Sequence, residues 1–175
     1  MSYGDKREKP SEEEMDNPIP KGKDLPPLPL LPEREWLRGK ITNVEYRYVY
    51  FNGRQQFMTD NKSGEQVLDA EGKPIPRREF NIEISCLDFE IAGSKDKQLR
   101  KAWVRLGASL NKKANMPKFL KKLEMNREED PSPREIIDYL TDLYVRFQLS
   151  NSEENEEGKI FQNVVWDAIK PDVGA

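Results

Sequence analysis

The side chains that most often perform catalysis are nearly missing from this sequence. It contains no histidine, the usual general base and a frequent metal ligand, and a single cysteine, Cys86. One cysteine without a histidine partner forms no intrachain disulfide, no cysteine-based zinc site and no activated thiol nucleophile. Cys86 also alternates with apolar residues, so we expect it to lie in the core.

Carboxylates and a lysine between positions 60 and 73 are the one arrangement that superficially matches catalytic machinery. Glu71-Gly-Lys73, with Asp60 or Asp69 before it, has the composition of a nuclease carboxylate–lysine set. Metal-assisted hydrolysis needs such carboxylates on a rigid support. Here they lie in a stretch with glycine and proline, where aspartate and glycine are ordinary turn formers. We therefore predict a non-enzymatic protein with no catalytic residue, no metal and no cofactor.

Basic and aromatic side chains in the middle of the chain fit a different chemistry. Single-stranded nucleic acid is held by cations that follow its phosphates and by exposed aromatic faces that stack on its bases. Residues 35–122 carry 18 Lys and Arg against 11 Asp and Glu, and ten of the sixteen aromatic residues. The flanking segments are acidic, so the overall charge of −3 conceals a polarised chain that can attract polyanions.

Nine residues of this basic block are the candidate nucleic-acid-binding residues. They are Arg38, Lys40, Arg47, Tyr48, Arg54, Trp103, Arg105, Lys112 and Lys113. For Tyr46, Tyr48 and Tyr50, packing in the core or at the end of the barrel is favoured over stacking on bases, and Tyr48 is the one that we select for exposure. The expected partner is single-stranded DNA or RNA, bound with little sequence preference.

A sheet must position these side chains, and alternating apolar patterns predict its strands. From Trp36 to Phe51 the apolar parity changes near Thr42-Asn43, which predicts a β-bulge and a sharply bent first strand. Residues 80–86 and 103–110 alternate regularly, with Trp103 and Arg105 on the outward side. Turn signals within residues 52–78 favour a loop that contains a short hairpin.

The pattern then changes to a helical one and returns to alternation. Residues 116–123 predict a helix with Asn115 as N-cap, and Ser132-Pro-Arg-Glu135 is a capping box that begins a second helix. Residues 143–149 and 159–170 predict a closing hairpin. Three strands, a helical segment and two strands are typical of the five-stranded oligonucleotide/oligosaccharide-binding (OB) fold. We predict a mainly β, closed OB-fold-like barrel, with a generic α+β sheet as the alternative.

Two stretches carry a family resemblance. Lys101-Ala-Trp-Val-Arg-Leu-Gly-Ala-Ser-Leu-Asn-Lys-Lys-Ala-Asn-Met-Pro-Lys-Phe-Leu-Lys-Lys-Leu123 is a strand, a basic turn and a Phe-Leu helix. Asp142-Leu-Tyr-Val-Arg-Phe-Gln-Leu-Ser150, followed by Gly158-Lys-Ile-Phe-Gln-Asn-Val-Val165, is similar to a closing hairpin. Over about residues 36–170 the chain resembles the single-stranded-DNA-binding-like OB-fold proteins of phage and bacterial replication and recombination modules. The resemblance implies nucleic-acid binding.

The ends of the chain differ from the middle. We predict a disordered, proline-rich and charged tail over residues 1–34, the OB-fold-like domain over 35–171 and a C-terminal tail over 172–175. Asp24–Pro32 also fits a ligand for an SH3-like groove, although a flexible arm is favoured. No apolar signal core and no membrane-length apolar run are found, so we expect a cytoplasmic protein in a reducing compartment, away from membranes.

An acidic turn argues for a second kind of partner. Residues 151–158 contain four glutamates, which repel phosphates, and Glu83 is expected to point outward near the binding face. The alternative function is therefore a protein-interaction module of a phage or replication assembly. Such a module would bind replication or recombination proteins through this acidic hairpin and the proline-rich N-terminal tail.

Overall fold

The computed structural model describes residues 11–18 and 28–174, and the chain divides into two compact units between Leu30 and Leu31. The first unit contains the short helix α1 (Glu12–Asp16), whose described side chains are exposed. The rest of the predicted tail, residues 1–10 and 19–27, lies outside the described residues, as does Ala175. These parts include Asp24–Pro27 of the proline-rich stretch.

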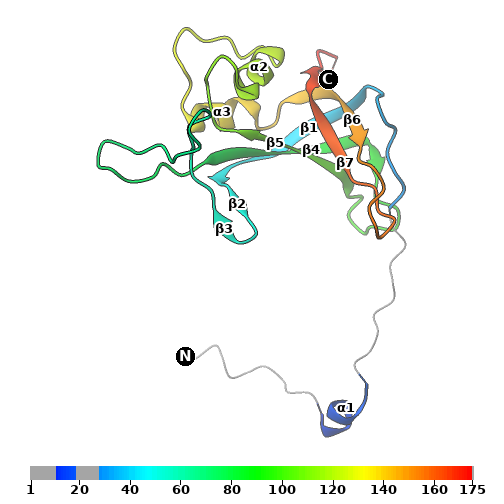
Figure 1. Ribbon diagram of the computed structural model, residues 1–175. Helices are drawn as coiled ribbons and strands as arrows, with labels where there is room; N and C mark the ends of the chain where they lie inside the picture. The colour runs from blue at the N-terminus through cyan, green and yellow to red at the C-terminus, as the bar shows by residue number, and fades with distance from the viewer. Residues whose placement is uncertain (1–10, 19–27, 175) are drawn as a thin grey trace, which may run out of the picture. The chain divides into compact units, whose positions relative to one another are not determined.

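Five strands of the second unit form one antiparallel sheet (Figure 1). They are β1 (Leu37–Tyr48), β4 (Arg78–Glu90), β5 (Leu99–Gly107), β6 (Tyr144–Asn151) and β7 (Gln162–Pro171). Their order in the sheet is β5-β4-β1-β6-β7. The prediction of a mainly β domain with its helical segment between the third and fourth long strands is confirmed.

The prediction of a closed barrel is wrong. Among the described residues, backbone pairing runs from β5 to β7 and stops there, although these two edge strands contact each other. Helix α2 (Asn115–Lys122) contacts both edge strands and buries Met116, Phe119 and Leu120. Apolar side chains, rather than a ladder of hydrogen bonds, therefore cover the core where the sheet remains open.

The bulge predicted in the first strand is confirmed. The register of β1 against β4 shifts between Ile41 and Asn43, and both Ile41 and Val44 are buried although their positions differ in parity. An extra residue in one strand bends it and restores the inward direction of the following side chains. The bend lets β1 pair with β4 along most of its length and with β6 near its start.

The two helices begin differently. Helix α3 (Pro133–Leu140) has the predicted capping box, in which Ser132 Oγ accepts from the Glu135 backbone N–H at 3.2 Å. The prediction of Asn115 as the N-cap of α2 is wrong. Ala114 has the extended backbone of the N-cap position, and Asn115 is already the first helical residue. The sequence signal was therefore displaced by one residue.

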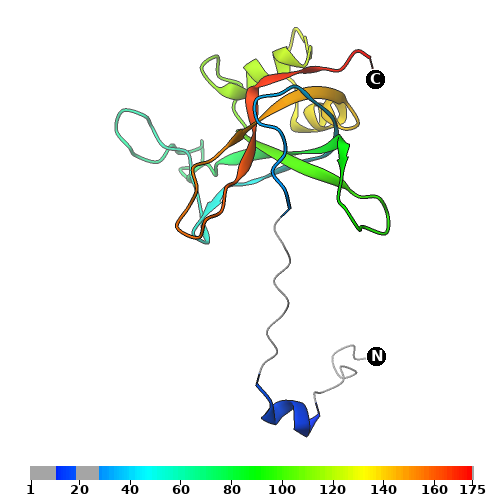
Figure 2. The same cartoon turned by 90° about the vertical axis from the view of Figure 1, so that its right-hand side faces the viewer.

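Residues 49–77 form an irregular arm that leaves the sheet after β1 (Figure 2). It begins with the predicted short hairpin, made of β2 (Tyr50–Phe51) and β3 (Arg54–Gln55). Asn52 and Gly53 form its turn with φ values of 50° and 74°, as a two-residue hairpin turn requires. Beyond it, isolated bridges such as Phe57 with Pro76 connect the two sides of the arm.

The second unit begins before the predicted boundary at residue 35. Leu31 is buried, and its backbone N–H donates to Gln162 Oε1 at 2.9 Å. The Arg34 N–H donates to the carbonyl of Leu149, and Glu33 accepts from the Asn151 N–H at 2.7 Å. Residues 31–34 thus pack along β6 and β7. The packing of these residues was not predicted from the sequence, because proline and charged residues interrupt any apolar alternation there.

Candidate nucleic-acid interface

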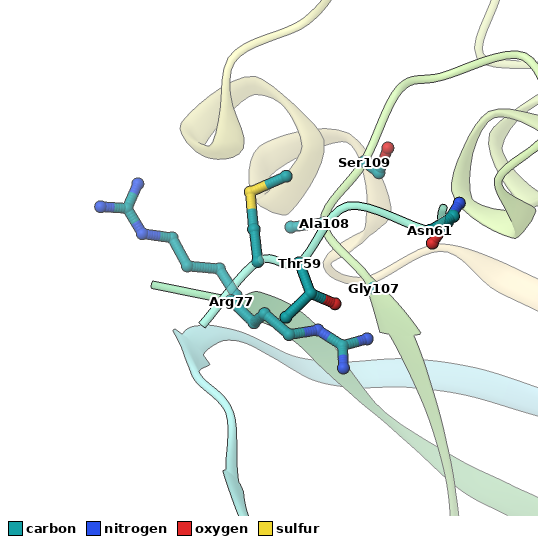
Figure 3. A pocket seen from close by; sticks show the side chains of 8 residues that line it. Thr59, Asn61, Arg77, Gly107, Ala108 and Ser109 are labelled. Carbon is teal, nitrogen blue, oxygen red and sulfur yellow. The ribbon is translucent and has the colours of Figure 1, made fainter. Parts of the chain in front are cut away.

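A polar pocket of about 380 Å³ lies between the arm and the end of β5 (Figure 3). Its lining comes from the arm, from the start of β4 and from the chain at and after the end of β5: Met58, Thr59, Asn61, Arg77, Arg78, Gly107, Ala108 and Ser109. Figure 3 labels Thr59, Asn61 and Arg77 of the arm together with Gly107, Ala108 and Ser109 from the end of β5 and the residues after it. Hydroxyl, amide and guanidinium groups dominate this lining, so the pocket offers hydrogen-bond donors suited to an anion.

Backbone hydrogen bonds position the two walls of the pocket. The Ala108 N–H donates to the carbonyl of Arg78 at 2.8 Å, which joins the end of β5 to the start of β4. The Met58 N–H donates to the carbonyl of Ile75, also at 2.8 Å, and connects the two sides of the arm. Gly107 adds no side chain, and a Cβ built there meets no atom within 4 Å. The main chain at Gly107 is therefore not covered by a side chain of its own or by close neighbours.

Two neighbouring arginines supply the positive charge of the pocket. Among the described residues, Arg77 has no carboxylate within ion-pair distance of its exposed guanidinium. Arg78 Nη1 donates to the Tyr46 hydroxyl at 3.2 Å, and its guanidinium lies 5.4 Å from the ring centre of Tyr48. The hydrogen bond to Tyr46 raises the pKa of Arg78. Both side chains are available to an anionic ligand without first breaking an ion pair.

The outward face of β5 continues from the pocket. Trp103 and Arg105 are both exposed there, with 48% of Trp103 accessible, and they pair across the sheet with Glu83 and Asn81. Burial raises the pKa of the Glu83 carboxyl, but hydrogen bonds from Lys101, Thr42 and Trp103 outweigh it and lower that pKa overall. Trp103 therefore lies beside a carboxylate that stays ionised near neutral pH.

Three of the predicted cations are already neutralised by carboxylates. Arg38 donates twice to Asp88, at 2.8 and 3.2 Å, and these bonds lower the pKa of Asp88. Lys40 Nζ lies 3.5 Å from a carboxylate oxygen of Asp142. Arg47 pairs with Glu79 at 3.1 Å and with Glu45 at 3.5 Å. A ligand phosphate at these positions would compete with carboxylates that are already in place.

The remaining predicted cations are exposed and carry no ion pair among the described residues. Arg54 lies on β3, Arg105 on β5, and Lys112 and Lys113 in the turn that follows β5. The structure thus separates the seven predicted cations into a neutralised group along β1 and an unpaired group around the arm and β5. Tyr48 is 45% exposed at the end of β1, next to the arm.

Four exposed residues, three of them in the arm and one at the start of β4, were not among the residues predicted from the sequence. Arg77 and Arg78 line the pocket, and Tyr50 and Phe51 of β2 are 62% and 68% exposed. Alternation along the first strand favours core packing for Tyr50, and that expectation is wrong. The chain leaves the five-stranded sheet at Val49, so the parity of β1 does not continue into β2. The adjacent pair Arg77-Arg78 at the start of β4 was the signal that could have been used.

The carboxylates considered for nuclease chemistry instead hold turns of the arm. Asp60 Oδ1 accepts from the backbone N–H groups of Lys62 and Ser63. Asp69 Oδ1 accepts in the same way from Glu71 and Lys73. Across residues 11–18 and 28–174, no group of three or more metal-ligating side chains gathers at one point. The turn interpretation explains these aspartates without a ligand.

Cys86 is completely buried in β4, and burial raises the pKa of its thiol to about 11. We predict that iodoacetamide at about pH 8 labels Cys86 only after the protein is unfolded, because the thiolate is the reactive form. Labelling followed by mass spectrometry measures this. The raised pKa also means that the thiol stabilises the fold below its ordinary pKa of about 8.5, and that this contribution is lost as the pH rises toward 11. Rapid labelling of the folded protein would contradict the prediction.

The acidic turn predicted at residues 151–158 connects β6 and β7. Asn155 Oδ1 accepts from the backbone N–H groups of Glu157 and Lys159, which gives the turn a defined conformation. Glu153, Glu154 and Glu156 are exposed and have no ion pair among the described residues. This hairpin therefore presents negative charge, in contrast to the arm.

None of the described helices has both the length and the apolar character that a membrane crossing requires. The sequence matches no model of a known protein family, and no curated protein is significantly similar to it.

Proposed function

We propose that the second unit is an OB-fold-like, partly open barrel that binds single-stranded nucleic acid, with DNA as the expected ligand, and performs no catalysis. The strand order supports the fold assignment, because β1 pairs with both β4 and β6 and the helical segment lies between β5 and β6. The residues assigned to binding are those of the pocket and of the outward face of β5.

The observation that carries the proposal is the distribution of unpaired positive charge. Arg54, Arg77 and Arg105 are exposed and unpaired among the described residues, whereas carboxylates neutralise Arg38, Lys40 and Arg47. Unpaired cations are free to neutralise phosphates, and each phosphate they neutralise releases counterions condensed on the nucleic acid, which favours binding. The ligand is therefore expected along the arm and β5 rather than along β1.

The same geometry explains why little sequence preference is expected. Arginine contacts to phosphates determine the position of a strand but carry no information about its bases. Thr59, Asn61 and Ser109 offer further hydrogen bonds within the pocket, and the bare Gly107 lets a ligand approach the main chain closely. Binding would then depend on charge and shape, with the exposed aromatic side chains contributing stacking.

A salt titration tests the proposal directly. The fluorescence anisotropy of a labelled single-stranded oligonucleotide of about 12 nucleotides is measured with the full chain between about 0.05 and 0.2 M salt. Binding that weakens linearly in log Kd against log salt supports nucleic-acid capture by cations. An absence of binding at the lowest salt concentration would overturn it.

Gly107→Leu provides a variant that fills the pocket without disturbing the core. Because a Cβ at this outward position meets nothing within 4 Å, we predict weaker oligonucleotide binding with an unchanged or higher melting temperature. Anisotropy and thermal unfolding are measured on the same preparation. Unchanged affinity in a folded variant would show that the ligand does not enter this pocket.

The acidic hairpin favours the second candidate function, a protein-interaction module. Its exposed glutamates lie close in sequence to Ile160 and Phe161, which are 37% and 57% exposed. Carboxylates next to apolar side chains fit a basic protein segment better than a nucleic acid. This alternative is favoured if the salt titration detects no oligonucleotide binding.

A further inference from the structure

Unpaired cations do not explain a preference for single strands, since they bind the phosphates of a duplex equally well. A preference for unpaired bases requires an aromatic face that a base can stack on. The described part of the candidate interface offers three such places: Trp103 on β5, Tyr48 at the end of β1, and the pair Tyr50 and Phe51 on β2. Their surroundings differ.

The first two places are compromised as stacking platforms. Trp103 lies directly across from Glu83 in the pairing of β4 with β5, so a strand that stacks there would bring its phosphates close to a negative charge. The Arg78 guanidinium lies over the ring of Tyr48, 5.4 Å from its centre, and already covers part of that ring. A base at either place would have to approach an anion or displace an arginine.

The β2–β3 hairpin lacks both obstacles. Tyr50 and Phe51 are the most exposed aromatic side chains among the described residues, at 62% and 68%, and neither makes a ring or cation contact. Their partners across the hairpin are Gln55 and Arg54, so the nearest charged group along the ladder is a cation without an ion pair. Figure 1 shows this hairpin extending away from the five-stranded sheet.

The exposure of two neighbouring aromatic side chains requires an explanation, because burial of aromatic surface usually stabilises the folded state and these side chains do not contribute it. Within the part of the chain that the structure describes, β2 and β3 pair with each other and with no other strand, and neither ring belongs to the core. We infer that Tyr50 and Phe51, on opposite faces of the hairpin because successive strand residues alternate, form a base-stacking finger that gives the domain its selectivity for unpaired bases, while Arg54, the partner of Phe51 across the hairpin, contacts the adjoining phosphate. This inference rests on the proposed function and assigns its selectivity to a specific hairpin.

Three probes of equal length separate base stacking from phosphate capture. They are a thymidine oligonucleotide of about 12 nucleotides, the same backbone with abasic sites, and a duplex. The full-length wild-type chain is expected to bind the thymidine strand more tightly than the other two at one fixed salt concentration. One stacked base corresponds to a factor of about 5 to 150 in Kd.

The variant Tyr50→Ala/Phe51→Ala removes the finger and leaves its backbone pairing in place. Its Kd for the thymidine strand should rise to the value for the abasic strand, while its Kd values for the abasic strand and the duplex stay unchanged. Tyr50→Phe/Phe51→Trp should retain the wild-type preference, because both rings persist. Phe161→Ala, at an equally exposed aromatic position beside the acidic turn, is the matched control and should bind all three probes like the wild type.

The outcomes distinguish this inference from the proposed function. If the double alanine variant keeps the wild-type preference, or loses affinity equally for all three probes, the finger is not the source of selectivity. The proposed function survives either result, because it rests on the salt-dependent affinity of the wild-type chain for the oligonucleotide, which neither result contradicts. If the wild-type chain binds none of the probes at low salt, the proposed function fails and the inference fails with it.

Discussion

Replacing Arg54, Arg77 and Arg105 together by glutamine is expected to weaken oligonucleotide binding by roughly tenfold to a hundredfold near physiological salt. Each cation that contacts a phosphate of a single strand contributes about 0.7 to the slope of log K against log salt, so three contacts contribute about 2. The triple variant should therefore show both the lower affinity and a slope that is shallower by about 2. Anisotropy titrations at several salt concentrations measure the two quantities in one experiment.

The matched control is the variant Arg38→Gln/Arg47→Gln, which removes cations that Asp88 and Glu79 already neutralise. Its affinity and its salt slope should remain close to those of the wild type, because these arginines already neutralise carboxylates and are not free to neutralise phosphates, the step that releases counterions from the nucleic acid. An equal loss in both variants would show that the ion pairs open on binding and that the ligand follows β1 as well. A loss in the control alone would move the interface away from the arm.

Gly39→Ala is expected to lower the free energy of unfolding by about 1–3 kcal/mol, and Gly39→Val by more. Gly39 lies in the interior of β1, where β4 and β6 both approach it. A Cβ at this position would lie 2.5 Å from Ile84 Cγ2 and 2.6 Å from Phe147 Cε1, and both side chains are completely buried. A close-packed core yields only by shifting side chains from their preferred rotamers. Urea denaturation monitored by circular dichroism measures the change.

Gly107→Ala in the same sheet is the control for this prediction. Its added Cβ meets no atom within 4 Å, so only the conformational effect of replacing glycine in a strand remains, and that effect is neutral or stabilising. The two alanine variants should therefore differ by the packing of one methyl group alone. Equal stability of the two would mean that the interior of β1 has room that the structure does not show.

The contrast between the arm and the acidic hairpin has a consequence for ligand orientation. Unpaired cations gather around the arm and the end of β5, whereas the turn between β6 and β7 presents exposed glutamates. A polyanion is attracted by the first region and repelled by the second. Under the proposed function the strand would follow β5 and the arm and avoid the acidic hairpin, which remains accessible to a protein partner.

Local patterns in the sequence were enough to predict the strands, the bulge in β1 and the capping box of α3. These features depend on residues close together in the chain, such as the change of parity between Ile41 and Val44 or the spacing of Ser132 and Glu135. Alternation also placed Trp103 and Arg105 outward, because it records which face of a strand meets the core. The same patterns could not show that β5 and β7 leave the barrel unclosed, since pairing between distant strands has no local signature.

Neither could the sequence show which cations are free. Arg38 and Asp88 are 50 positions apart and Arg47 and Glu79 are 32 apart, yet the register of β1 beside β4 brings each pair into contact. Arg54, Arg77 and Arg105 are chemically the same kind of residue and find no such partner among the described residues. Periodicity reports the direction of a side chain, whereas its neighbour depends on strand register and on where the chain leaves the sheet. For this reason the residue types of the candidate interface could be selected from the sequence, while the tertiary structure was needed to locate the unpaired charge and the exposed aromatic hairpin.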